Sequence, residues 1–401
     1  MDPVSSLPAI AALFVAIMVT YLIYRCFGAP PDQRRFASID GLRGYLAFFV
    51  FLHHSSIWYF YLRQGQWRIP PSNLYTHFGQ SSVAFFFMIT GFLFFSKLID
   101  GKTRGVDWGK LFISRFLRLV PLYLFVMLLL FSVIALLSNG VLNEPLPKLI
   151  KGVIRWLGFT ILGAPNLNGI DHTSTIVARV TWSLLYEWFF YFSLPLLALT
   201  VRVTPPLPYL ILGIVSIVGL SIWHPQTHHL LSFLGGIAAS FLVRINAFRQ
   251  FAVRGIASLL VLGFIAITVT AFPSVYGIVP LLLLSLAFSL IAGGNSMFKV
   301  LVSPVSRTLG EMSYSIYLLH GITLFITFTF IIGINEAKEL SSITHWMLVV
   351  GISPILILTS FCTFRFIERP AMQSTHAVTA WLRSRLTLRP KGRAASGAPL
   401  R

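Results

Sequence analysis

The chain has 401 residues, of which 56% are hydrophobic and only 11% are charged, and its formal net charge is +19. Because soluble domains carry about 25% charged residues, this composition excludes a water-facing globular fold. The basic residues lie between apolar runs rather than on one soluble face, so the charge indicates a membrane protein and not a nucleic-acid-binding one. The two cysteines, Cys26 and Cys362, have neither metal-ligand spacing nor a disulfide pattern.

Apolar runs long enough to cross a bilayer recur along the whole chain, where about 20 predominantly apolar residues make one spanning helix. The first run has no basic segment before it and no cleavage site after it, so it is interpreted as a span rather than a signal peptide. The sequence thus predicts an all-α polytopic membrane protein with about eleven transmembrane helices, at residues 7–26, 42–62, 79–98, 111–137, 182–201, 207–223, 229–246, 254–272, 275–293, 312–334 and 344–366.

Lysine and arginine are distributed unequally between the two predicted sides of the membrane. With the N-terminus outside, 24 of the 31 basic residues fall on the cytoplasmic side and seven on the outer side. The positive-inside rule therefore places the C-terminus in the cytoplasm. The longest outer connection is 138–181, and its segment 150–162 is a candidate to re-enter the membrane. The tail after Pro370 is basic and rich in small residues, so we expect it to be disordered.

Ionisable residues inside a span are costly, which makes each one a functional candidate. Arg43 and His54 lie eleven residues apart in the second run. This spacing puts them within about 20° on one helix face and about 16 Å apart along the axis, with Arg43 at the cytoplasmic rim and His54 near the midplane. The alternative is that His54 only hydrogen-bonds a neighbouring helix.

Two further ionisable residues are expected at a similar depth. Glu187 lies about 8 Å below the outer surface, whereas His54 and His320 lie about 16 and 12 Å from the inner one, in a core of about 30 Å. An imidazole beside a carboxylate is suited to general base catalysis. The alternative for Glu187 is an ion pair with a cation at the interface, such as Arg179.

A third feature stands at the cytoplasmic end of the fourth run. Arg115 and Arg118 share one helix face at i, i+3 spacing and, with Arg43, could form an anion-binding mouth. A guanidinium suits phosphate because its planar fork binds two oxygens. The alternative is that these arginines serve only to orient the helix. No Walker A motif, dinucleotide fingerprint or histidine metal pair occurs in the sequence, so no metal site is expected.

Six short motifs in order resemble the acyltransferase-3 family of membrane O-acyltransferases. The first resembles its R-x10-H signature, and the second has Thr90 where the family usually has serine. The six segments are DGLRG at 40–44 followed by His54, FFFMITGFL at 85–93, RFLRLVPLY at 115–123, TWSLLYE at 181–187, SYSIYLLH at 313–320 and FIERP at 366–370.

The resemblance implies a domain organisation and an activity. A ten-helix acyltransferase domain would occupy 36–372, after an extra N-terminal helix and linker at 1–35 and before a basic tail at 373–401. The family implies transfer of an acetyl or other short acyl group from cytoplasmic acyl-CoA, with acetyl-CoA the expected donor, to a hydroxyl of an extracytoplasmic polysaccharide or glycolipid sugar. No permanently bound cofactor is implied, and the expected location is a bacterial inner membrane.

The resemblance also assigns roles to residues. His54 would be the catalytic base or a transient acyl carrier, and the sequence leaves both open. Glu187 and His320 would orient or assist it. The CoA phosphates would be bound by Arg43, Arg115 and Arg118, while Gly91 would let the backbone approach the pantetheine arm.

Two other classes of function remain open from the sequence. A transporter or flippase of a glycan or glycolipid would also carry charges inside the membrane, but without consuming a thioester. A non-catalytic assembly protein would tolerate loss of the His54 side chain.

Overall fold

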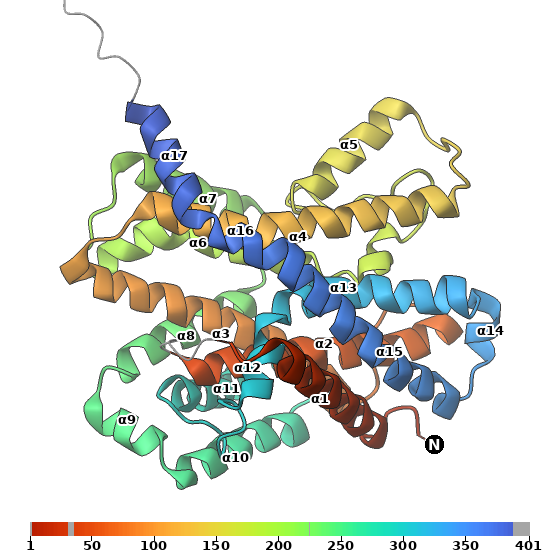
Figure 1. Cartoon of the computed structure of the whole chain (residues 1–401), viewed down its shortest axis with the longest axis horizontal. Helices are drawn as coiled ribbons and strands as arrows, with labels where there is room; N and C mark the ends of the chain where they lie inside the picture. Colours follow the sequence, from red (N-terminus) through yellow and green to blue (C-terminus); the bar gives the residue numbers. More distant parts are fainter. Residues whose placement is uncertain (1, 31–35, 224, 388–401) are drawn as a thin grey trace, which may run out of the picture.

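The computed structural model describes residues 2–30, 36–223 and 225–387, and within them it is all-helical, with a single isolated bridge between Leu167 and Ile170 and no strand (Figure 1). The predicted fold class is confirmed. The longer helices are α1 (Leu7–Phe27), α2 (Ala37–Gln64), α3 (Asn73–Arg104), α4 (Trp108–Leu137), α6 (Trp182–Thr200), α7 (Leu207–Trp223), α8 (Thr227–Leu242), α10 (Gly255–Ala271), α11 (Ile278–Ala292), α13 (Ser313–Ile326) and α15 (Ser342–Thr363).

Shorter helical segments connect or flank these helices. They are α5 (Leu146–Leu157), the 3₁₀ turn η1 (Thr173–Val177), α9 (Asn246–Ala252), α12 (Pro304–Glu311), the π-helical η2 (Thr327–Ile331), α14 (Ile334–Glu339), the π-helical η3 (Phe364–Glu368), α16 (Arg369–Gln373) and α17 (Thr375–Thr387).

The number of membrane spans depends on how the shorter helices are counted. In the described chain six helices are long and apolar enough to cross a bilayer, or seven if α8 and α9, bent by 108°, form one span. Helices α7, α10 and α11 are apolar but shorter, and α2 has the length but carries polar residues. Each of the eleven predicted runs falls on a helix, but the count of eleven spans stays a prediction.

Helix α2 lies at the centre of the bundle, where it packs against α3, α12 and α13. Two glycines of its DGLRG segment permit the closest of these contacts. A β carbon at Gly41 would collide with the backbone of Leu301, and one at Gly44 with the backbone of Leu309. From the facing helix α12, Gly310 fits against the carbonyl of Asp40. This backbone-to-backbone crossing fixes the start of α2, and with it the position of the arginine between the two glycines.

The N-terminal helix α1 lies along α15 and α12 (Figure 1). Its contact face is made of small residues, because Ala9, Ala12 and Ala16 are buried while the larger side chains such as Leu7 and Phe14 are exposed. Small residues let two helix backbones approach each other in lipid. The sequence-predicted extra helix is therefore present, packed on the outside of the bundle.

The C-terminal region corrects one expectation. Residues Thr375–Thr387 form α17, which packs on α4, instead of the expected disordered tail. An exposed ion pair of 2.7 Å joins Arg383 of this helix to Asp107, the residue that caps α4. A composition rich in small and basic residues did not reveal this tertiary contact. The rest of the predicted tail, 388–401, lies outside the described residues.

Most of the segment that is a candidate to re-enter the membrane belongs to the short helix α5, which stands apart from the main body in Figure 1, and its re-entry stays a prediction. Its twelve residues span only about 18 Å. Exposed Leu146, Ile150 and Ile154 lie on one face, and Lys151 and Arg155 on another. This pattern is typical of a helix that lies in the membrane interface.

Candidate active site

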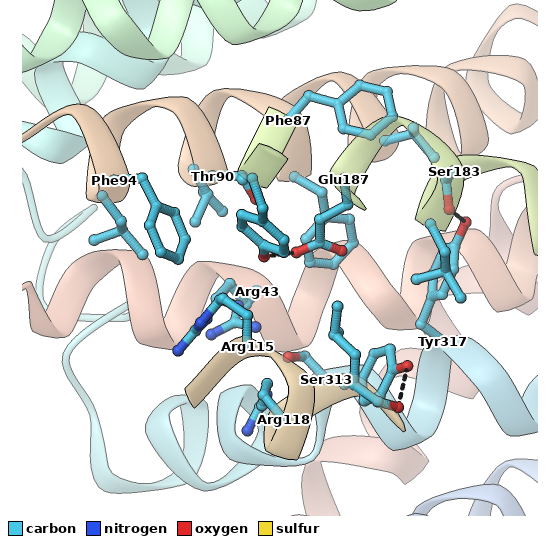
Figure 2. Close-up of a pocket in the computed structure, with 18 residues that line it drawn as sticks. Arg43, Phe87, Thr90, Phe94, Arg115, Arg118, Ser183, Glu187, Ser313 and Tyr317 are labelled. Atoms are coloured by element: carbon cyan, nitrogen blue, oxygen red, sulfur yellow. Dashed lines mark hydrogen bonds between the residues drawn. The ribbon is translucent and has the colours of Figure 1, made fainter. Parts of the chain in front are cut away.

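A cavity opens between α2, α3, α4, α6 and α13, all of which contribute side chains to its wall (Figure 2). The empty space amounts to about 790 Å³, including the part open to solvent. The polar side chains that define its chemistry include Arg43, Arg115, Arg118, Glu187, Tyr191 and Tyr317.

The three predicted arginines converge on this cavity, as Figure 2 shows. Arg43 comes from α2, while Arg115 and Arg118 come from successive turns of α4. The Nε atoms of Arg43 and Arg115 are buried and have no hydrogen-bond partner. Within the described chain, neither of these two side chains forms an ion pair, and Arg115 lies over the ring of Phe94 at 5.0 Å. Buried donors without a partner are costly, and an anion in the cavity would supply the missing acceptor.

The third arginine is held by a carboxylate that the sequence analysis did not assign to the site. Arg118 Nη1 lies 3.5 Å from Oε2 of Glu368, whose side chain is completely buried. The other oxygen of Glu368 accepts a hydrogen bond from Ser315, and Thr363 donates to Ser315 at 2.9 Å. This network joins the FIERP segment to α4 and α13 and positions Arg118. In the sequence, the feature that could have identified Glu368 was its position as a charged residue at the end of an apolar run.

Glu187 lies in the arginine cavity and not beside His54. It points from α6 into the space above Arg43 and Arg115 in Figure 2, and it accepts a hydrogen bond from Tyr191 one turn further along α6. It forms no ion pair with Arg179, the alternative considered for it. Similar depth in the membrane, on which the sequence argument rested, does not determine which way a helix presents its side chains.

The other two predicted residues meet directly. His320 Nε2 lies 3.1 Å from His54 Nδ1, with the rings 5.0 Å apart and inclined by 30°. Helices α2 and α13 pack against each other and carry the two rings to this contact. His320 is completely buried, whereas His54 keeps some accessible surface. Residues 266 positions apart in the chain therefore form one imidazole pair.

The hydrogen bonds around the pair define one consistent set of neutral tautomers. Nδ1 of His320 is 3.2 Å from the carbonyl of Ile316, so it carries a proton and leaves Nε2 as an acceptor. Nδ1 of His54 then donates to that Nε2 and to the carbonyl of Val50 at 3.0 Å. Nε2 of His54 is left unprotonated. This nitrogen has no hydrogen-bond partner among the described residues and is not fully buried.

One side chain links the cavity to the imidazole pair. Tyr317 lines the cavity and lies one helical turn before His320, with ring centroids 6.1 Å apart. Its hydroxyl is 2.7 Å from that of Ser183. The cavity wall thus runs from the three arginines to Tyr317, and the histidines lie just beyond it.

Gly91 does not line the cavity. A β carbon there would collide with the backbone carbonyl of Phe233, so its small size serves the close packing of α3 on α8. On the same contact, Gly236 fits against the carbonyl of Met88. This placement does not support a contact between Gly91 and the pantetheine arm of a donor.

No group of histidine, cysteine and acidic residues in the described chain is arranged to hold a metal ion. The fold and the site are those of a polytopic helical membrane protein with a cavity that three arginines line, one of them paired with Glu368, and with an imidazole pair beyond the cavity. The comparison with protein families identifies its family. The acyltransferase-3 model, described as "Acyltransferase domain", matches residues 36–365, and the chain belongs to this family of membrane acyltransferases. No curated protein and no solved structure matches the chain.

Proposed function

We propose that the protein transfers an acetyl or other short acyl group from cytoplasmic acyl-CoA to a hydroxyl of an extracytoplasmic polysaccharide or glycolipid sugar. The observation that carries this proposal is the open Nε2 of His54 beyond an arginine-lined cavity. The proposed location is a bacterial inner membrane with the C-terminus in the cytoplasm, supported by the excess of basic residues on the predicted inner side.

The donor enters at the arginines. Arg43 and Arg115 supply charge-assisted hydrogen bonds to the CoA phosphates, and Arg118 is held in place for the same task by Glu368. The acyl thioester then reaches past Tyr317 towards His54. Glu187 acts at the donor end of the cavity, where its carboxylate helps to balance the arginine charge before the donor binds.

The chemical step uses the unprotonated nitrogen of His54. The acceptor hydroxyl oxygen attacks the thioester carbonyl carbon while His54 Nε2 takes the hydroxyl proton. The new carbon–oxygen bond forms as the carbon–sulfur bond breaks, and the CoA thiolate then takes up the proton from His54. The products are an ester and CoA thiol, and the base is regenerated. His320 acts as the positioning partner of His54.

The test compares two adjacent histidines in purified membranes supplied with labelled acetyl-CoA. His54→Ala is expected to lower CoA release about 10²- to 10⁴-fold, the range for loss of a general base. His53→Asn is the matched control, because His53 Nδ1 bonds the carbonyl of Tyr75 at 2.7 Å and an asparagine amide can replace that bond. Full activity of His54→Ala in membranes that contain the inserted protein would reject the enzyme, and glycan movement without CoA release would favour a transporter.

In the second role considered for His54, as an acyl carrier, the same nitrogen attacks the thioester carbonyl carbon, and the carbon–sulfur bond breaks to release the CoA thiolate. It predicts an acyl-imidazole on the protein when labelled donor is supplied without acceptor. Label that stays with the wild-type protein after rapid quenching, and is absent from His54→Ala, would identify the carrier. If no label is bound to the protein, His54 acts as the base.

A further inference from the structure

Two connections far apart in the sequence meet next to the imidazole pair. Trp67, in the connection between α2 and α3, stacks on His54 with ring centroids 6.0 Å apart and an inclination of 27°. The guanidinium of Arg179, in the connection between η1 and α6, lies 5.9 Å from the centre of the Trp67 ring. The His54 ring is thus bordered by an indole, and the guanidinium of Arg179 lies next to that indole.

The backbone that carries Arg179 is rigidly held in an uncommon conformation. Ala178 and Arg179 have φ of 50° and 56°, in the left-handed region that residues with a β carbon rarely adopt. The amide of Arg179 donates to the carbonyl of Ser174 at 2.8 Å. Gly321, the residue after His320, leaves room for the backbone of Val177 and Ala178 to lie on α13. Strain of this kind persists where the surroundings enforce it and is concentrated at ligand sites.

The side chains of Trp67 and Arg179 both have accessible surface that a ligand can contact. Trp67 is half-buried against the edges of Tyr61 and Trp58 at 5.3 and 5.8 Å, which fixes the orientation of its ring. Arg179 is exposed, and its guanidinium lies over the Trp67 ring. The accessible part of the indole offers apolar area to a sugar ring, and a guanidinium binds a carboxylate or phosphate with two hydrogen bonds.

We propose that Trp67 and Arg179 form an acceptor subsite beside His54, which takes a sugar that bears an anionic group, either a carboxylate or a phosphate. This inference rests on the proposed acyl transfer, because it places the acceptor hydroxyl at His54 Nε2. The indole orients the ring of the sugar and the guanidinium pairs with its charge. The acceptor is then an acidic glycan, or one attached through phosphate, rather than a neutral polysaccharide.

Equilibrium binding to the full-length protein in detergent tests the subsite without any turnover. The three probes are labelled trigalacturonate, its carboxyl-reduced trisaccharide and galactose 1-phosphate. Wild-type protein should bind at least one charged probe about 10-fold or more tighter than the neutral one, since each factor of ten corresponds to about 1.4 kcal/mol and a hydrogen bond to a charged group supplies this much. The carboxylate and phosphate probes distinguish the two sources of charge.

Two exposed outer arginines provide the matched variants. Arg179→Gln should abolish the preference for the charged probe without changing neutral binding, and Arg179→Lys should restore part of it. Arg68→Gln removes the same charge from the connection that carries Trp67 and should leave the preference intact. Equal binding of all three probes by the wild type, or equal effects of Arg179→Gln and Arg68→Gln, would overturn the subsite. Charge-selective binding by a protein that consumes no acetyl-CoA would support the subsite and reject the proposed function.

Discussion

The hydrogen bond between the two histidines allows their roles to be separated by one substitution. In His320→Leu, a buried imidazole is replaced by an apolar side chain, so His54 Nδ1 loses one of its two acceptors. The other acceptor, the carbonyl of Val50 at 3.0 Å, belongs to the same helix and remains. His54 therefore keeps its tautomer, with Nε2 still unprotonated and available as the base.

The size of the effect follows from this geometry. One neutral hydrogen bond contributes about 0.5–1.5 kcal/mol, which corresponds to about a 2- to 12-fold loss in kcat. Removing the base itself, in His54→Leu, should cost about 10²- to 10⁴-fold. The donor KM should change little in either variant, because the arginines that bind the donor lie in a separate part of the structure.

The assay is the initial rate of CoA release over a range of acetyl-CoA concentrations, in membranes that contain equal amounts of each inserted variant. The expected result is a modest loss of kcat for His320→Leu and a large one for His54→Leu. If the two variants lose the same large factor, the proton must leave His54 through His320. The assignment of His320 as a positioning residue would then be wrong.

Three further predictions concern the cavity and the packing around it. Arg115→Gln should raise the KM for acetyl-CoA about 12- to 140-fold, since a hydrogen bond to a charged group contributes about 1.5–3 kcal/mol. An unchanged KM in the CoA-release assay would remove this residue from the donor site. Gly91→Leu should lower the free energy of unfolding by about 1–3 kcal/mol. Gly219→Leu is the control and should not lower it, because a β carbon at Gly219 would meet no other atom within 4 Å. Equal melting temperatures of the two variants in detergent would contradict the packing role of Gly91. Glu368→Gln leaves Arg118 without its carboxylate and should lower the free energy of unfolding by about 3–5 kcal/mol, which would appear as a lower melting temperature. An unchanged melting temperature would show that the ion pair does not stabilise the fold.

Much of the fold could be predicted from the sequence, because lipid imposes a simple rule on it. A backbone in the bilayer must satisfy its own hydrogen bonds, so each long apolar run becomes a helix. Every predicted run coincides with a helix in the structure. The helical periodicity of α2 also put Arg43 and His54 on one face, and each meets a partner or cavity inside the bundle. The ordered motifs indicated the family that the comparison identifies.

Only the tertiary structure decided which side chains share a site. Depth along the membrane normal can be counted from the sequence, but the rotation of each helix about its axis depends on how its neighbours pack. Because of this rotation, Glu187 faces the arginines and His320 contacts His54. The same packing places Gly91 in the contact between α3 and α8. Contacts that close through loops, such as Arg179 over Trp67, have no periodicity to reveal them. Their positions follow from the folded backbone alone.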